Sequence, residues 1–167
     1  LVRGDNVFYI LVPNGKLVDV YTFTVRRRPV YTVSFQTNDS AIPPQDVEEG
    51  SFATMPTQPT REGYVFAKWA FDFSTPITDN TVVSAVWQTN TYSISYVLNG
   101  GINSASNPTT YTADSSTIIL AAPTRSHYIF VGWVEGNSIP HGSTGNKIFT
   151  ANWKPITYSI SYVLNGG

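Results

Sequence analysis

The chain contains no cysteine, and this absence removes three kinds of chemistry at once. Without thiols there is no disulfide framework, no thiolate metal site and no cysteine nucleophile. Charged residues make up only 13% of the 167 residues, roughly half the usual share of ~25%. The polar surface must therefore come from Thr, Ser and Asn, and such a surface favours strands and turns over helices.

Two further absences limit the partners. The net charge is −1, so there is no basic field to attract nucleic acid. No apolar run reaches the ~18 residues that a membrane-spanning helix needs, so we expect no membrane insertion by this segment. The chain starts without Met and without the apolar stretch of a signal peptide, and we expect it to be a fragment of a larger protein.

An internal repeat is the strongest feature of the chain. Residues 92–101 read YSISYVLNGG, residues 158–167 repeat the same ten letters, and residues 31–39 are a looser version. Further matches follow at similar offsets, and they pair Pro59-Thr60-Arg61 with Pro123-Thr124-Arg125, Trp69 with Trp133, and Trp87 with Trp153. A period above 60 residues predicts small domains with their own cores rather than a solenoid.

Alternation of apolar and polar residues predicts strands. In residues 92–98 the side chains of Tyr92, Ile94, Tyr96 and Leu98 share one face, and Asn99-Gly100-Gly101 supplies a tight turn. Residues 64–69 form the next expected strand, with Phe66 and Trp69 on opposite faces. Residues 82–87 and 147–153 are expected closing strands. The Pro-rich stretch 50–59 excludes a long helix but leaves room for one helical turn.

The first 29 residues differ from the repeats. Residues 7–12 are expected to form an apolar strand, residues 17–25 alternate as a second strand, and Asn14-Gly15 between them is a hairpin signal. Arg26-Arg27-Arg28-Pro29 is interpreted as a linker. Because two strands alone are barely stable in water, we expect this hairpin to be either the end of a preceding sandwich-like β domain or a cap on the first repeat.

The repeated motifs resemble those of the internalin B-repeat family, also called the Listeria–Bacteroides repeat. In the first unit the resemblance runs through residues 31–39, 47–50, 59–69 and 85–87, and in the second through residues 92–101, 123–125, 130–133 and 151–153. Departures from the family pattern are Asn38-Asp39-Ser40 in place of Asn-Gly-Gly, Lys68 in place of Gly, and His127 in place of Gly.

The resemblance implies tandem β-grasp (ubiquitin-like) modules in a mostly β chain. We expect the strands of a preceding domain plus a linker over residues 1–29, repeat 1 over residues 30–89, repeat 2 over residues 90–156, and the truncated start of repeat 3 over residues 157–167. It also implies a secreted or cell-surface bacterial protein in which the modules act as spacers or adhesion units.

No group of residues forms a convincing catalytic pattern. The only histidines, His127 and His141, lie in the second repeat, whereas a duplicated active site would recur in both. Asp72 and Asp79 could form a weak calcium site, but their spacing fits no EF-hand loop. An intramolecular Lys–Asn crosslink from Lys68 or Lys147 is another possibility. We nominate no catalytic, metal or cofactor residue and expect no cofactor.

The four tryptophans allow two interpretations. Exposed aromatic rings could stack on sugars, which would make the chain a polysaccharide-binding module. The same rings recur at matching positions, and a domain of ~60 residues without disulfides needs large aromatic side chains in its core, so we favour the core. Arg61 and Arg125 are expected to pin their turns or to stack on an aromatic ring.

Two short motifs that contain arginine remain. Arg3-Gly4-Asp5 matches an integrin-type tripeptide, and Arg26-Arg27-Arg28 is better explained as a solvated linker than as a nucleic-acid patch. We therefore expect a non-enzymatic, extracellular repeat region that acts as a spacer and binds a host or neighbouring-cell surface protein. It is expected to be monomeric, and polysaccharide binding is the alternative. An enzyme is the third possibility, with its catalytic domain outside this fragment.

Overall fold

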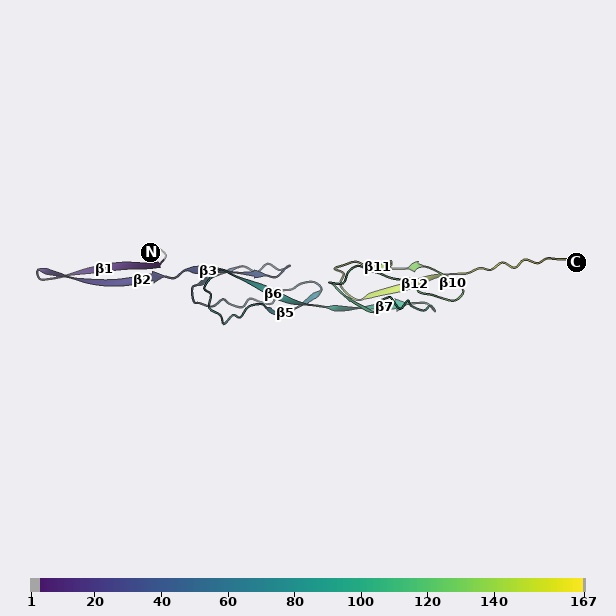
Figure 1. Ribbon diagram of the computed structural model, residues 1–167, viewed down its shortest axis with the longest axis horizontal. Coiled ribbons are helices and arrows are strands. Elements are labelled where there is room, and N and C mark those ends of the chain that lie inside the picture. Colours follow the sequence, from purple (N-terminus) through teal and green to yellow (C-terminus); the bar gives the residue numbers. More distant parts are fainter. Residues whose placement is uncertain (1–3, 167) are drawn as a thin grey trace. The chain divides into compact units, whose positions relative to one another are not determined.

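The structure is a computed structural model that describes residues 4–166, in which strands make up 48% of the chain and no residue is helical (Figure 1). The prediction of a mostly β chain is therefore confirmed. The chain divides into two compact units. One unit holds the residues up to Arg61 together with Phe66–Trp87, and the other holds Glu62–Val65 together with the residues from Gln88 onward.

A long hairpin opens the described chain. Strand β1 (Gly4–Asn14) pairs antiparallel with β2 (Leu17–Arg27), and Phe8 lies opposite Phe23. The turn between them contains Gly15 at a φ of 65°, a conformation that glycine adopts without steric cost. The predicted hairpin is confirmed, but the predicted linker is too long: Arg26 and Arg27 belong to β2, because the register extends to the Gly4–Arg27 pair.

Repeat 1 contains a four-stranded mixed sheet. Its strands are β3 (Val30–Gln36), β4 (Gln45–Glu48), β5 (Tyr64–Trp69) and β6 (Thr81–Thr89), in the order β4-β3-β6-β5. The first and last strands, β3 and β6, lie side by side and parallel, with Val33 opposite Thr81. The core on one face of this sheet consists of Val33, Val47, Ala53, Trp69, Ile77 and Val83.

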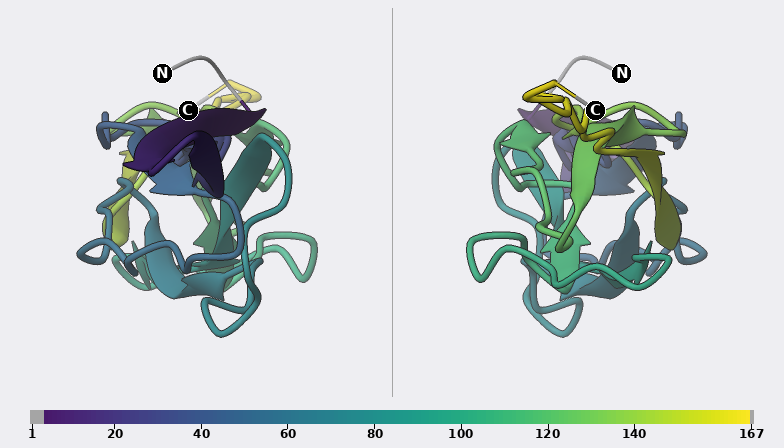
Figure 2. Two further views of the ribbon diagram at one scale, coloured as in Figure 1. Left: turned by 90° about the vertical axis from the view of Figure 1, so that its left-hand side faces the viewer. Right: turned by 90° about the vertical axis from the view of Figure 1, so that its right-hand side faces the viewer.

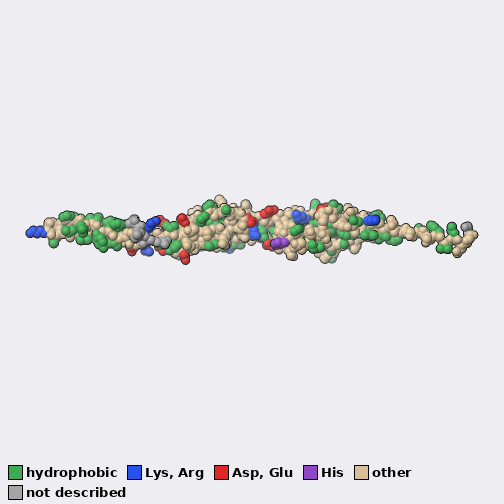
Figure 3. All heavy atoms as spheres, turned by 90° about the horizontal axis from the view of Figure 1, so that it is seen from above, with side chains coloured by type: hydrophobic (Ala, Val, Ile, Leu, Met, Phe, Trp, Pro, Cys, Tyr) green, Lys and Arg blue, Asp and Glu red, His purple; other side chains and the backbone are tan. Residues whose placement is uncertain are grey.

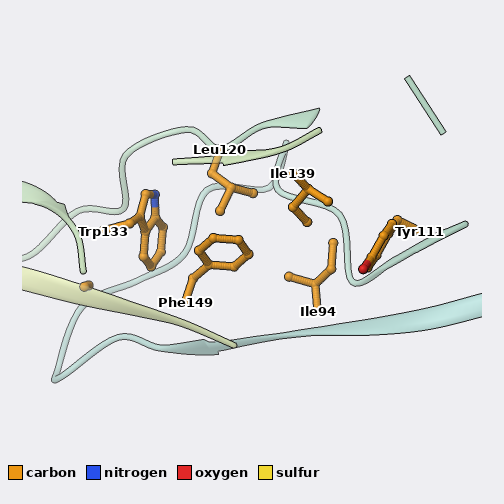
Figure 4. Packing of buried hydrophobic residues seen from close by; sticks show 7 residues of the cluster. Ile94, Tyr111, Leu120, Trp133, Ile139 and Phe149 are labelled. Atoms are coloured by element: carbon orange, nitrogen blue, oxygen red, sulfur yellow. The ribbon is translucent and has the colours of Figure 1, made fainter. Parts of the chain in front are cut away.

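Repeat 2 contains a sheet of the same kind. Its strands are β7 (Thr91–Val97), β8 (Thr110–Thr112), β10 (Tyr128–Trp133) and β12 (Lys147–Pro155), in the order β10-β12-β7-β8 with β7 and β12 parallel. A second, two-stranded sheet pairs β9 (Ile118–Ile119) with β11 (Ser138–Ile139). Figure 4 shows the core side chains converging between these strands; the core comprises Ile94, Tyr111, Leu120, Trp133, Ile139, Phe149 and Ala151.

Loops cover the core face of each sheet. Residues 51–61 of repeat 1 contain no helix and no strand, so the helical turn that the sequence left open does not form there. The segment is held by backbone bonds: the N–H of Ile77 donates to the oxygen of Ser51, and the N–H of Gly50 donates to the oxygen of Ile77. Figure 2 likewise shows only strands, loops and turns.

The predicted placement of Trp69 is wrong. Strict alternation put Phe66 and Trp69 on opposite faces of β5, yet their rings meet at 5.3 Å and Trp69 is buried in the core. In repeat 2 the matching rings of Phe130 and Trp133 meet at 5.4 Å, and the β10–β12 register shifts between Phe130 and Gly132. Such a bulge inserts one extra residue and turns the next side chain to the other face.

The segment that follows β12 is exposed. Residues 156–164 form neither strand nor helix. The side chains of Tyr158, Ile160 and Tyr162 are 72–80% exposed. The described residues also contain no helix of the length and hydropathy needed to cross a membrane.

Candidate functional site

The tryptophans lie in the module cores. Trp69 and Trp133 are each 6% exposed, while Trp87 and Trp153 are half-buried against Phe66 and Phe130 at 5.8 and 5.4 Å. These positions agree with the core interpretation of the repeated aromatic residues. A sugar-stacking site needs open ring faces, and the buried rings of Trp69 and Trp133 do not offer them.

The indole N–H groups differ between the modules. In repeat 2 the N–H of Trp153 donates to the backbone oxygen of Leu98 at 2.9 Å. The N–H groups of Trp69, Trp87 and Trp133 are buried with no acceptor among the described residues. A buried donor without an acceptor costs about 1–3 kcal/mol. Among the four tryptophans, Trp153 avoids this cost through its hydrogen bond to Leu98.

The arginines of both Pro-Thr-Arg turns contact neighbouring side chains. The guanidinium of Arg125 lies 3.6 Å from the ring centroid of Tyr128 and also lies beside Gly100. In repeat 1, Nε of Arg61 lies 3.8 Å from Oδ2 of Asp39. The predicted stacking on an aromatic ring is therefore confirmed at Arg125. Arg61 forms an ion pair with Asp39, the residue that replaces Gly100 in repeat 1.

Departures from the family pattern leave the turn geometry intact. Asn38 has a φ of 76° and Asn99 a φ of 49°, so both repeats place asparagine in the left-handed region after the opening strand. His127 has a φ of 63° where Gly63 has 82°. Asparagine and histidine are among the side chains that tolerate this region best, and the two repeats therefore make the same turns with different residues.

Sequence reasoning missed the asparagine that precedes each closing strand. The side-chain oxygen of Asn80 accepts from the N–H of Thr32, and that of Asn146 accepts from the N–H of Ser93, both at 2.9 Å. Each bond connects the start of the module to its last strand. A signal was present in the sequence, because both residues stand directly before the closing strands.

A second feature that the sequence did not reveal is a side-chain amide that both donates to and accepts from the backbone of one loop residue, an arrangement that we call an amide bracket. The side-chain amide of Gln45 both accepts from the N–H of Thr54 and donates to its oxygen, at 2.8 and 2.7 Å. Asn107 makes the same pair of bonds to Ala121, at 2.7 and 3.0 Å. The two amides occupy different places relative to their strands, so no matching letters in the sequence reveal them.

The carboxylates are occupied by neighbouring donors. Glu135 accepts from the N–H and the hydroxyl of Thr150 at 2.7 and 2.8 Å, and the N–H bond, ahead of the hydroxyl, lowers the pKa of its carboxyl. The hydroxyl and N–H of Ser74 lower the pKa of Asp72. Asp79 accepts from the N–H of Asn80. Between residues 4 and 166 no three His, Asp or Glu side chains gather as metal ligands would.

The remaining candidates are scattered. His141 is exposed, and its Nδ1 lies 3.0 Å from the oxygen of Ser115. Lys68 is exposed at the end of β5 and Lys147 is half-buried at the start of β12. In the Arg3-Gly4-Asp5 motif, Arg3 lies outside the described residues, while Gly4 and Asp5 begin β1. The structure brings none of these residues together as a site.

Two clefts open on the modules. A cleft of about 650 Å³ lies between β4 and the loop that carries Ser51, Phe52 and Thr54. A smaller one, of about 300 Å³, is lined in repeat 2 by Glu135, Ser138, Asn146 and Lys147. In the smaller cleft, the carboxylate of Glu135 and the side-chain oxygen of Asn146 are already used by Thr150 and Ser93, so they do not form the converging free groups of an active site.

The most unusual surface is apolar and lies on the hairpin. On one face Phe8 stacks on Phe23 at 5.2 Å, with Ile10 opposite Tyr21 beside them. These side chains are 37–58% exposed, and Figure 3 shows hydrophobic side chains along the visible face of the hairpin. Contiguous exposed apolar surface of this kind marks interaction sites.

The chain belongs to the Listeria–Bacteroides repeat family. The family's domain model matches residues 31–86 and 92–153, which together make up more than half of the chain. This result confirms the resemblance that the repeated motifs suggested.

Two longer proteins of Evansella cellulosilytica are similar to it. One, named "Putative Gly-rich membrane protein", is 29% identical over 155 residues, which cover 83% of this chain and 18% of the relative. The other, named "Putative membrane protein", is 34% identical over 151 residues, which cover 80% of this chain and 22% of the relative. The chain thus spans about a fifth of the length of these two relatives.

Proposed function

We propose that this chain is a non-catalytic repeat region of a bacterial surface or secreted protein, where its modules act as a spacer and as a protein-binding unit outside the cell. The observation that carries the proposal is that the two modules share their fold but not the polar side chains of their clefts. Both have the same strand order, the same core tryptophans and the same asparagine before the last strand. The polar side chains in their clefts differ, so no potential active site is duplicated.

Membership of a repeat family and the names of the two relatives support this role, because those names describe membrane proteins. A spacer needs only modules that fold independently, and each repeat has its own apolar core. A binding unit needs an accessible surface, and the apolar face of the hairpin offers one.

The modules are proposed to be variants of the β-grasp fold. In each sheet the first and last strands are parallel neighbours at the centre, and the second and third strands lie at the edges. This order supports a β-grasp module, although a loop takes the place where a helix would pack. The proposal would fail if an experimental structure showed a different strand order.

The hairpin is proposed to be part of a larger β domain. Two antiparallel strands alone are marginal in water, and apolar residues on both faces of β1 and β2 are exposed. Burial of one of those faces by further strands would stabilise the hairpin and leave the other face accessible. Limited proteolysis of the 167-residue chain should cut β1 and β2 before either repeat, whereas equal resistance of all three parts would contradict this view.

The functional proposal is tested by binding. We expect the 167-residue chain to bind mammalian or bacterial cells through protein and not to bind a broad glycan array. Phe23→Lys, in the face of the hairpin that carries Phe8 and Ile10, should reduce cell binding several-fold. Thr22→Lys adds the same charge to the face that carries Tyr9 and Leu11, and it is the matched control that separates the two faces.

Three results would change the assignment. Selective glycan binding would favour the polysaccharide-binding alternative. Equal cell binding by Phe23→Lys and Thr22→Lys would show that the Phe23 face of the hairpin does not make the contact with cells. No binding to cells or glycans would leave a spacer without an adhesive role.

A further inference from the structure

The larger cleft, of about 650 Å³, lies along an edge of the repeat 1 sheet, and all four residues of β4 line it. Strand β4 is the outermost strand in the order β4-β3-β6-β5, and within residues 4–166 β3 is the strand that pairs with it. The loop that carries Ser51, Phe52 and Thr54 also lines the cleft. An edge strand beside a cleft can accept an extended peptide as a further strand.

The backbone of Asp46 points away from the sheet. Thr32, which lies opposite Asp46 in β3, donates its N–H to the side chain of Asn80 instead. Asn80 directly precedes β6, on the other side of β3. Opposite residues of an antiparallel pair either exchange both backbone bonds or exchange neither. The N–H and oxygen of Asp46, and the N–H of Glu48 two residues further on, therefore face the open edge.

The matching edge of repeat 2 is covered by a side chain. Its edge strand is β8, in which Thr112 holds the place of Glu48. The hydroxyl of Ser115 accepts from the N–H of Thr112, and the N–H of Ser115 donates to the oxygen of Thr112, both at 3.0 Å. In repeat 1, Ser51 donates in the same way to the oxygen of Glu48 at 2.9 Å. No side chain of residues 4–166 accepts from the N–H of Glu48, so repeat 1 leaves open a donor that repeat 2 covers.

The two faces beside the β4 edge differ in character. Asp46 and Glu48 are exposed on one face. On the other face Val47 is buried in the core, and Phe52 of the covering loop is 57% exposed. The three arginines of residues 26–28 line a neighbouring cleft together with Glu48 and offset its charge. Asp46 is therefore the carboxylate that a basic side chain would meet at this edge.

We propose that the edge of β4 binds an extended segment of a partner protein, which adds to the repeat 1 sheet as a further strand. Its backbone pairs with the outward groups of Asp46 and Glu48. Because side chains alternate along a strand, the residue opposite Asp46 is a lysine or arginine, and its two neighbours are apolar and pack on Phe52. Opposite charges facing each other across two strands stabilise their pairing.

This edge is a second surface for the protein-binding role proposed above, and it is separate from the apolar face of the hairpin. The test uses peptides rather than cells, so failure of one surface does not imply failure of the other. The probe is a short peptide of alternating valine and lysine with blocked ends. The same peptide, N-methylated throughout, keeps the charges but lacks the N–H donors of a strand.

Nuclear magnetic resonance of the isotope-labelled 167-residue chain locates the binding. We expect the unmethylated peptide to shift the amide signals of β4 and of residues 51–54, and the methylated peptide to leave them in place. The signals of β8 should stay unchanged, because Ser115 covers its outward N–H and its outward side chains, Thr110 and Thr112, carry no charge.

Two matched substitutions test the charge. Asp46→Asn keeps the side-chain oxygen that accepts from the hydroxyl of Thr32 at 3.1 Å but removes the carboxylate, and it should weaken peptide binding several-fold. Asp72→Asn removes one charge from the same repeat outside the cleft and should leave binding unchanged. Four results would overturn the proposal: no shift at ~1 mM peptide, equal shifts with the methylated peptide, equal shifts in β8, or equal binding by the two variants.

Discussion

Repeat 1 and repeat 2 each have a sheet with the same strand order, but different side-chain contacts surround the two sheets. Each has a parallel central pair, a buried tryptophan on its third strand and an asparagine before its last strand. Beside the buried tryptophan, repeat 1 packs Phe71 on Phe73 at 5.2 Å, whereas repeat 2 bonds Glu135 to Thr150. The apolar core and the strand order are thus the common design, and the polar contacts around them are interchangeable.

The largest expected effect tests whether each core stands alone. Trp133→Ala should cost about 3–5 kcal/mol, close to the whole stability of a module of this size, and should unfold repeat 2. Trp69→Ala should do the same to repeat 1. Amide hydrogen exchange read separately for residues 30–89 and 90–156 measures both effects. Loss of protection in both repeats from either substitution would show that the cores are not independent.

The amide brackets should differ in cost because Asn107 is only 8% exposed and Gln45 is half-buried. Asn107→Ala leaves the N–H and oxygen of Ala121 without their partner, and we expect a loss of about 1–3 kcal/mol. Gln45→Ala exposes Thr54 to water and should cost about 1 kcal/mol or less. Urea denaturation of the two variants gives both values, and equal costs would mean that burial does not decide the effect.

A smaller difference is expected at the last tryptophan of each repeat. Trp153→Phe removes a hydrogen bond to Leu98, whereas Trp87→Phe removes an N–H that has no acceptor among the described residues. Trp153→Phe should therefore destabilise its module by about 1 kcal/mol more than Trp87→Phe does. Thermal unfolding followed by near-UV circular dichroism can compare the two variants. A reversed order would show that Trp87 finds an acceptor in solution.

The smallest effect concerns pH and Glu135. Because the folded pKa of Glu135 lies below its ordinary value of 4.5, the carboxylate stabilises the folded state above that value. The contribution is lost as the pH falls through the folded pKa. Between pH 6 and pH 3, wild-type repeat 2 should lose more stability than the Glu135→Gln variant.

Urea midpoints at the two pH values measure that loss. Asp72→Asn is the matched control, because Asp72 also has a lowered pKa but lies in repeat 1. An unchanged pH dependence in the Glu135→Gln protein would remove Glu135 as its source.

The sequence determined much of this architecture. The repeated letters and the alternation of apolar and polar residues identified the opening and closing strands of the repeats. The Asn14-Gly15 pair identified the hairpin turn, and the recurrence of Trp69 and Trp133 indicated the core. These features could be predicted because side-chain alternation and turn chemistry act over a few neighbouring residues.

Tertiary structure decided the rest. The ring of Trp69 packs against that of Phe66, and bonds between distant segments gave Gln45, Asn107 and Glu135 their roles. Those contacts join residues that lie far apart in the chain, so a pattern of neighbouring side chains does not reveal them.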